Sequence, residues 1–488
     1  MAHQAHNIPW GLLASNLEWK SPTPWNNFAT NLYPRMKPNQ AKDLTHFVNA
    51  FVQNLAEHAA CERKKYPAHY EPPQPSDVIL SDATVRKILP TVRRWRNEDF
   101  PLSCRHEMCE CDPIPYEERL MSAFLRPPHS RSEHWEYPHM NDAAFFNFQI
   151  LQTLLLYGEM DPILRVCAHP DSHDLLKFWY VGDFWEGPGD LGWDKICQHM
   201  TKVYICLNIA YCFPETWDFA SGRTEENDYR NAKFYQKTLI TAAGVTPWDV
   251  RTYPHTQFFG MEESCGRLDL RTNTGKSEHW LLDEGYNAMM RNKGKRQCAR
   301  ASLWDFKYKA ENNPVGFYGR VPIHEFLALW MPEGWGYAPS GDEVDEVRAV
   351  LCQRGLPVEL ALDVMDFAGY RPPRGRLGVP HDPMHPGNRE ALGQYLKYCW
   401  QTMVRCYTLA TEMGMDPVGS MNAGEGMNWK NFVADAIVDL FGHHKDGRKH
   451  HWTEVEFVEK LPRVWYKKES VSDDDAPDGW RGPFTTFV

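Results

Sequence analysis

The chain has 488 residues, a formal net charge of −11, 42% hydrophobic residues and 13% aromatic residues. The hydrophobic fraction is that of a globular protein with a sizeable core, and the length allows roughly two to four structural units. The acidic balance excludes a protein covered in basic surface, although a local basic groove could still bind phosphate.

The amino-terminal end lacks a basic segment followed by an apolar run, and no window is apolar over the length that a membrane span needs. We therefore expect neither a signal peptide nor a membrane partner. Thirteen cysteines, an odd number, are spread along the sequence. Without an export signal they are expected to be reduced thiols, and we predict a cytoplasmic protein.

Residues 1–38 contain several tryptophans and prolines and predict an extended arm on the surface. Residues 39–58 predict an amphipathic helix, because their apolar residues recur at the helical spacing. These residues are Leu44, Phe47, Val48, Phe51, Val52 and Leu55. After a proline-rich linker, Ser81 or Asp82 is expected to cap a second helix, which Pro90 is expected to break or kink.

A cluster of metal-capable residues follows, at Cys104, His106, Cys109 and Cys111. Four ligands within eight positions would strain one tetrahedral zinc centre, and no second pair of ligands follows at the spacing of a zinc site. Ordinary buried thiols are therefore favoured over a structural metal.

Apolar and amphipathic segments predict that most of the remaining chain is helical. The helices are expected at 141–157, 196–212, 231–243, 343–354, 357–368, 388–413 and 428–441. Short alternating runs separated by turns at 246–330 predict a small mixed α/β region inserted among them.

The predicted fold is thus mainly α, with this small mixed α/β insertion, a large single globular core and a C-terminal helical subdomain. The predicted domain limits are 1–75 for the arm and first helix, 76–340 for the main helical domain, 341–470 for the helical subdomain and 471–488 for a mobile tail.

The segment 178–195 interleaves carboxylates with large aromatic side chains around a Gly-Pro-Gly turn. Because carboxylates usually lie in water and large aromatics in cores, this mixture predicts a pocket wall or the mouth of a cleft. Asp183 and Glu186 are the candidate catalytic pair, at a spacing that could share a metal or a proton. The candidate substrate contacts beside them are Trp179, Trp185 and Asp190. The alternative is a loop at the edge of the core whose carboxylates cap helices and pair with arginine or lysine.

A second candidate site is basic. Clustered cations at 291–300, beside a glycine, suit a phosphate, a diphosphate or a nucleic-acid backbone, and a solvated face is the alternative. Its candidate substrate-binding residues are Arg291, Lys293 and Lys295. Together with the cations of the helix at 86–96, it would offer the two-point contact that a polynucleotide needs.

Two further candidates lie in the mixed α/β region. His279 lies beside Trp280 with Asp283 four residues later, the spacing of an oriented base on a helix, and both His279 and Asp283 are candidate catalytic residues. A satisfied structural histidine is the alternative. Asp305 shares a strand face with Lys307, and is a candidate substrate contact or one half of a surface ion pair.

Several familiar catalytic motifs are absent from the sequence. It contains no P-loop, no dinucleotide-binding glycine motif, no nucleophile-elbow serine and no set of kinase motifs. ATP-driven, nicotinamide-dependent and ordinary hydrolase functions are therefore disfavoured.

Two C-terminal segments, LPVELALDVMDFAGY at 356–370 and DPMHPGNREALGQYLKYCW at 382–400, resemble the C-terminal part of a large group of uncharacterised filamentous-fungal proteins. The LPxEL opening also resembles the start of an F-box helix. Two kinds of fungal biosynthetic enzyme come from such groups. Arginine-containing cyclodipeptide synthases take aminoacyl groups from tRNA, and non-canonical terpene cyclases ionise a prenyl diphosphate with magnesium. Neither resemblance assigns a catalytic residue to a position in this sequence.

The basic segments and the acids of 178–194 favour the first kind of enzyme, a tRNA-dependent, arginine-containing cyclodipeptide synthase. Such a transferase would bind aminoacyl-tRNA, release a small-molecule product and need no cofactor. The alternative is a magnesium-dependent terpene cyclase, for which Asn227-Asp228 begins a metal motif that then has Asn231 and Tyr235 where serine and glutamate are expected. A second alternative is a non-enzymatic, F-box-like adaptor.

Overall fold

The structure is a computed structural model of the 488-residue chain. The residues that it describes are 7–19, 32–35, 40–99, 114–126, 142–172, 193–224, 226–232, 234–235, 238, 258–259, 341–368, 370, 377–379, 382–414, 429–441, 452–458 and 461–466.

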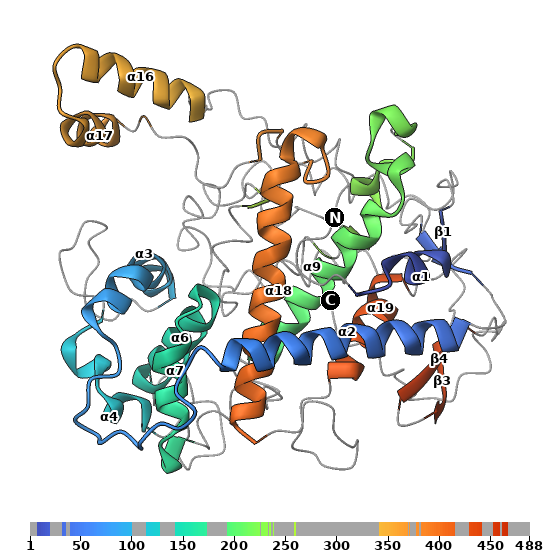
Figure 1. Ribbon diagram of the computed structural model, residues 1–488, viewed down its shortest axis with the longest axis horizontal. Helices are drawn as coiled ribbons and strands as arrows, with labels where there is room; N and C mark the ends of the chain where they lie inside the picture. Colours follow the sequence, from blue (N-terminus) through green and yellow to red (C-terminus); the bar gives the residue numbers. More distant parts are fainter. Residues whose placement is uncertain are drawn as a thin grey trace, which may run out of the picture.

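Four helices form the centre of the molecule: α2 (Gln40–Arg63), α9 (Trp193–Tyr211), α18 (Arg389–Glu412) and α19 (Trp429–Phe441). Helix α18 packs against α2 and α9, and α19 packs against the same two helices. Figure 1 shows α2 crossing α18. The fold is mainly helical, as predicted, and helices from both halves of the sequence share one core.

The apolar pattern of α2 explains its place in this core. The five apolar residues predicted between Phe47 and Leu55 are all buried, because helical spacing puts them on one face. The ring of Phe51 lies 6.1 Å from that of Tyr204 on α9 and 5.5 Å from that of Trp400 on α18. The helix predicted at 39–58 is therefore confirmed, although it continues to Arg63.

A second group of helices lies beside this core. Helix α6 (Asp142–Tyr157) packs against α3 (Asp82–Asp99), α4 (Met121–Phe124) and α7 (Met160–Cys167). Helix α18 also contacts α6 and α7, which joins the two groups (Figure 1).

Helix α3 confirms the predicted cap but not the predicted break. The Ser81 hydroxyl accepts a hydrogen bond from the Thr84 N–H at 3.2 Å, as an N-cap side chain does. The helix then continues past Pro90 to Asp99, so of the predicted break or kink at that proline the break is wrong, and the kink stays a prediction. Ile88 and Val92 on either side of the proline are fully buried, and their packing offsets the missing backbone hydrogen bond.

The described parts of the amino-terminal region, 7–19 and 32–35, pack against the core, so the prediction of an extended surface arm is wrong for these residues. It forms α1 (Trp10–Ser15) and an antiparallel pair of strands, β1 (Leu17–Trp19) and β2 (Leu32–Pro34). The ring of Trp10 lies 5.3 Å from that of Phe47 and 5.6 Å from that of Tyr204, so it fills a gap between α2 and α9.

A hairpin near the C-terminal end was not predicted. Strands β3 (Trp452–Val458) and β4 (Leu461–Tyr466) pair antiparallel, with Trp452 opposite Tyr466, and β4 packs against α19 and α2. Single turns of 3-10 helix complete the described elements. They are η1 (Tyr116–Arg119), η2 (Pro170–Ser172), η4 (Pro214–Thr216), η5 (Phe219–Ser221), η6 (Tyr229–Asn231) and η8 (Pro386–Asn388).

The other predicted helices are confirmed within three residues at each end, apart from 231–243, which lies largely outside the described residues. The two that complete the set are α16 (Gly341–Gln353) and α17 (Val358–Phe367). The mixed α/β region predicted at 246–330 also lies outside the described residues, apart from Phe258 and Phe259, and the predicted domain limits stay predictions. Among the helices described, none is long and apolar enough to cross a membrane.

Candidate functional site

The site residues predicted from the sequence all lie outside the described residues, and they stay predictions. They are Asp183, Glu186, His279, Asp283, Trp179, Trp185, Asp190, Arg291, Lys293, Lys295 and Asp305. The cluster at Cys104, His106, Cys109 and Cys111 lies outside them too. In the part of the chain that the structure covers, no group of three or more histidine, cysteine, aspartate or glutamate side chains is placed to hold a metal ion.

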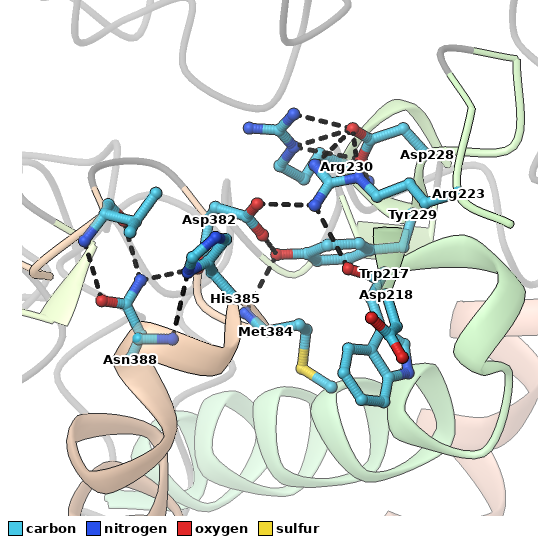
Figure 2. A network of polar contacts seen from close by, with 12 residues as sticks. Trp217, Asp218, Arg223, Asp228, Tyr229, Arg230, Asp382, Met384, His385 and Asn388 are labelled. Atoms are coloured by element: carbon cyan, nitrogen blue, oxygen red, sulfur yellow. Dashed lines mark hydrogen bonds and ion pairs between the residues drawn. The ribbon is translucent and has the colours of Figure 1, made fainter. Parts of the chain in front are cut away.

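The structure instead shows a buried polar network that sequence reasoning missed (Figure 2). It joins two segments far apart in the chain, 217–230 and 379–388. Three short turns build it, and each begins with a side-chain cap. Asp218 accepts from the Ala220 N–H at the start of η5, Asp228 from the Arg230 N–H at η6, and His385 from the Gly387 N–H at η8.

Arg223 is the centre of this network. Its side chain is almost fully buried, and its guanidinium contacts a carboxylate on each side. One terminal nitrogen lies 2.6 Å from Asp228 Oδ2, and the other lies 2.6 Å from Asp382 Oδ2. Its Nε also donates to Asp228, and Nη1 donates to the carbonyl oxygen of Trp217 at 3.3 Å. The planar guanidinium thereby links the two segments directly, across 159 positions of sequence.

Tyr229 makes the second link between the segments. Its side chain is fully buried, and its hydroxyl donates to Asp382 Oδ1 at 2.9 Å. The Tyr229 hydroxyl oxygen also accepts from the Met384 N–H at 3.2 Å. Burial, together with the negative charge of Asp382, raises the pKa of Tyr229 well above its ordinary value. Tyr229 therefore stays protonated and acts as a fixed donor.

Asp228 holds two cations. Burial by itself would raise the pKa of Asp228, but the hydrogen bonds and charge of Arg230, with the charge of Arg223, outweigh burial and lower it. Arg230 Nη2 lies 2.7 Å from Asp228 Oδ2. The carboxylates of Asp228 and Asp382 thus balance the two guanidiniums at the centre of the network.

Asn388 closes the network on the side of α18. Its Nδ2 donates to the carbonyl oxygens of Asp382 at 2.7 Å and Val379 at 2.8 Å, while its Oδ1 accepts from the Val379 N–H. This holds the loop that carries Asp382 against the start of α18. At the centre of the network the charged side chains satisfy one another, so the network, hereafter the clamp, holds its two segments together rigidly.

The outer edge of the clamp carries two more accessible rings. Phe219 is 65% exposed, covers the Arg223 guanidinium at 4.7 Å from its ring centroid, and lies edge-on to the half-buried His385 at 6.4 Å. His385 Nδ1 accepts from a backbone N–H, which puts the ring proton of the neutral form on Nε2. This edge is the part of the clamp that a small molecule could touch.

The side chains of Asn227 and Asp228, the start of the possible metal motif, both have hydrogen-bond partners within the protein. Asn227 donates from its amide to the carbonyl oxygens of Glu215 at 2.7 Å and Gly222 at 3.1 Å, and it accepts from Thr224. With Asp228 bound to two arginines, both side chains are fully engaged within the protein. Neither is a free magnesium ligand, which weighs against this half of the terpene-cyclase motif.

One sequence signal could have found the clamp. The segment that contains Asp382, His385 and Asn388 is part of the DPMHPGNR stretch that resembles the fungal group, and Asp228 stood out as half of an acidic motif. Arg223 gave no such signal, because an arginine in a turn-rich segment is usually exposed.

A family model described as "Gramillins biosynthetic cluster protein GRA5" matches residues 11–453. No curated protein and no solved structure matches the chain.

Proposed function

The chain belongs to the family of the gramillins biosynthetic cluster protein GRA5, and from this premise we propose that it is an enzyme of fungal specialised metabolism. One observation carries the proposal: the match runs over 11–453 of 488 residues. It therefore includes the four central helices and both segments of the clamp. The family likeness therefore covers most of the sequence, and the fungal resemblance predicted from the C-terminal segments agrees with it.

The finer form of the proposal is aminoacyl transfer from aminoacyl-tRNA to form an arginine-containing cyclic dipeptide. Its support is the sequence pattern: acids among aromatic rings at 178–194, which suit a guanidinium, and cations at 86–96 and 291–300, which suit a polynucleotide. In this form Asp183 and Glu186 bind or activate the substrate, and no cofactor is needed. The engaged state of Asn227 and Asp228 favours it over the magnesium-dependent terpene cyclase.

Expression of the chain in a host without the cluster, followed by metabolite profiling, tests the proposal. We expect a new small molecule, and we expect tRNA to co-purify with the protein. Asp183→Ala combined with Glu186→Ala should abolish the product and leave the melting temperature unchanged. Glu117→Ala removes an exposed acid on η1 and is the matched control.

The outcomes separate the levels of the proposal. Full activity of the double variant would overturn the pocket assignment, while a product without bound tRNA would overturn aminoacyl transfer alone. Diphosphate released from a prenyl substrate in the presence of magnesium would instead support the terpene cyclase. The absence of any new product with the complete set of cluster proteins would overturn the enzyme proposal itself.

A further inference from the structure

Helices α16 and α17 form a hairpin that Figure 1 shows set apart from the other helices. They pack mainly on each other. The turn between them has the hydrogen bonds of a Schellman motif: the Leu356 N–H donates to the Leu351 carbonyl oxygen at 3.2 Å, and the Gly355 N–H donates to that of Cys352 at 3.0 Å. Gly355 has φ of 96°, which a glycine adopts without strain. The hairpin is therefore a defined local structure.

The hairpin leaves much of its apolar surface uncovered. Among the described residues, five of the eight large hydrophobic side chains that are exposed belong to it. These are Val350, Val358, Leu360, Leu362 and Val364, which are 47%, 50%, 53%, 44% and 49% exposed. A soluble surface usually exposes such side chains singly, so a concentration of this kind marks a surface that another molecule covers.

Helical spacing shows how this surface is arranged on α17. Ala361 and Met365, four residues apart, are buried and form the covered strip. Leu362 extends the apolar surface on one side of that strip, and Leu360 with Val364 extends it on the other. The apolar arc of α17 is thus wider than α16 can cover, and a helix with so wide an arc is ordinarily buried on several sides.

The charge of the hairpin limits what can cover it. Residues 341–367 contain seven acids and two arginines, which leaves a formal charge of −5 out of −11 for the whole chain. Glu359 and Asp363 are exposed on the same helix as the apolar strips. A second copy of this chain would place −5 opposite −5, which opposes self-association. A partner has to bring cations as well as apolar side chains.

We infer that the α16–α17 hairpin docks a partner protein through a cationic amphipathic helix. The apolar face of that helix covers the strip that contains Leu360 and Val364, and its flanking lysine or arginine side chains face Glu359 and Asp363, which lie beside that strip on α17. This arrangement is the helix-in-groove mode of recognition with complementary charge at the rim. It does not depend on the enzyme function proposed above.

The probe for this surface is a synthetic 18-residue helical peptide with leucines on one face and lysines on both flanks, labelled with a fluorophore. The control peptide carries glutamate in place of each lysine. Fluorescence anisotropy with the full-length protein should show binding of the lysine peptide only. Leu360→Ser combined with Val364→Ser should weaken binding at least about tenfold, the effect of losing two interface anchors. Glu359→Lys combined with Asp363→Lys should weaken it and flatten its salt dependence.

Val78→Ser is the matched control, because Val78 is 39% exposed but lies outside the hairpin. It should bind the lysine peptide as the wild type does, and no variant should shift the melting temperature. The inference is overturned if the lysine peptide fails to bind, if both peptides bind equally, or if the hairpin variants bind as tightly as Val78→Ser. Light scattering adds one more test: a dimer that the Leu360→Ser, Val364→Ser variant dissociates would show that a second copy is the occupant.

Discussion

The clamp around Arg223 and the α16–α17 hairpin depart from the ordinary distribution of residues in opposite ways. The clamp buries charges, while the hairpin exposes valine and leucine. In the clamp the buried charges form ion pairs with one another, so they need no partner from outside the protein. In the hairpin the apolar strips exceed what the two helices cover. Buried charges that pair with one another stabilise the fold and do not indicate a binding site. Apolar side chains that stay exposed to water, in contrast, indicate a surface that a partner covers.

The largest effect is expected from breaking the clamp at its centre. Arg223→Met leaves Asp228 and Asp382 buried without their shared cation, which should cost about 3–5 kcal/mol of unfolding free energy. Arg348→Met on α16 removes a surface ion pair with Asp345, 2.8 Å long, and should cost about 0.5 kcal/mol or less. Guanidinium denaturation of both variants measures the contrast. Equal losses of unfolding free energy in the two variants would contradict the conclusion that the Arg223 ion pairs stabilise the fold more than a surface pair does.

Acid should weaken the clamp through Asp228. Its pKa is lowered in the folded protein, so the carboxylate stabilises the fold above its unfolded pKa of about 3.9, and this contribution is lost as the pH falls through the folded value. The difference in unfolding free energy between the wild type and Asp228→Asn should therefore be largest near neutral pH and shrink toward acid. Urea denaturation over that range measures it. A difference that stays constant with pH would show that Asp228 contributes through packing instead.

Tyr229→Phe should have a smaller effect than the loss of Arg223. It removes one donor from Asp382 and one acceptor from the Met384 N–H, which leaves two buried groups short of a hydrogen bond, at about 1–3 kcal/mol. Tyr116→Phe removes the hydroxyl of a tyrosine that is 58% exposed and should leave stability unchanged. Thermal unfolding of the two variants checks this, and equal melting temperatures would contradict a linking role for the Tyr229 hydroxyl.

The sequence predicted the individual helices better than it predicted the contacts between distant parts of the chain. Helical spacing from Phe47 to Leu55 depends on local pattern, which a sequence displays directly. The clamp depends on Arg223 meeting Asp382, and nothing local signals a contact across 159 positions. The prediction of a surface arm failed at Trp10 for the same reason, because Trp10 packs on Phe47 and Tyr204, which belong to helices distant in sequence. The exposure of Leu360 could not be predicted, because an apolar helix looks the same whether or not a partner covers it.

Two glycines at helix ends, Gly158 and Gly355, both have a positive φ but differ in what surrounds them. Gly158 follows α6 with φ of 76°, and a methyl group there would lie 2.7 Å from Arg405 Nη2. Gly355 has φ of 96° with no atom within 4 Å of such a methyl group. Gly355→Ala should lower the unfolding free energy by about 1–2 kcal/mol, because alanine is strained in the left-handed conformation. Gly158→Ala has the same strain and also displaces Arg405 from the end of α6, so it should cost more. Denaturation should thus rank Gly158→Ala as the more destabilising, and the reverse order would contradict the packing around Arg405.

The smallest effect is expected on the exposed strip of α17. Leu360 is 53% exposed, so Leu360→Ala should change the unfolding free energy by no more than about 0.5 kcal/mol. Leu154→Ala in α6 is the contrasting change, because Leu154 is fully buried and its loss should cost about 2–5 kcal/mol through a cavity. Denaturation of the isolated protein measures both. If Leu360→Ala also cost several kcal/mol, the strip would already be covered within the chain, and the hairpin would have no surface left for a partner.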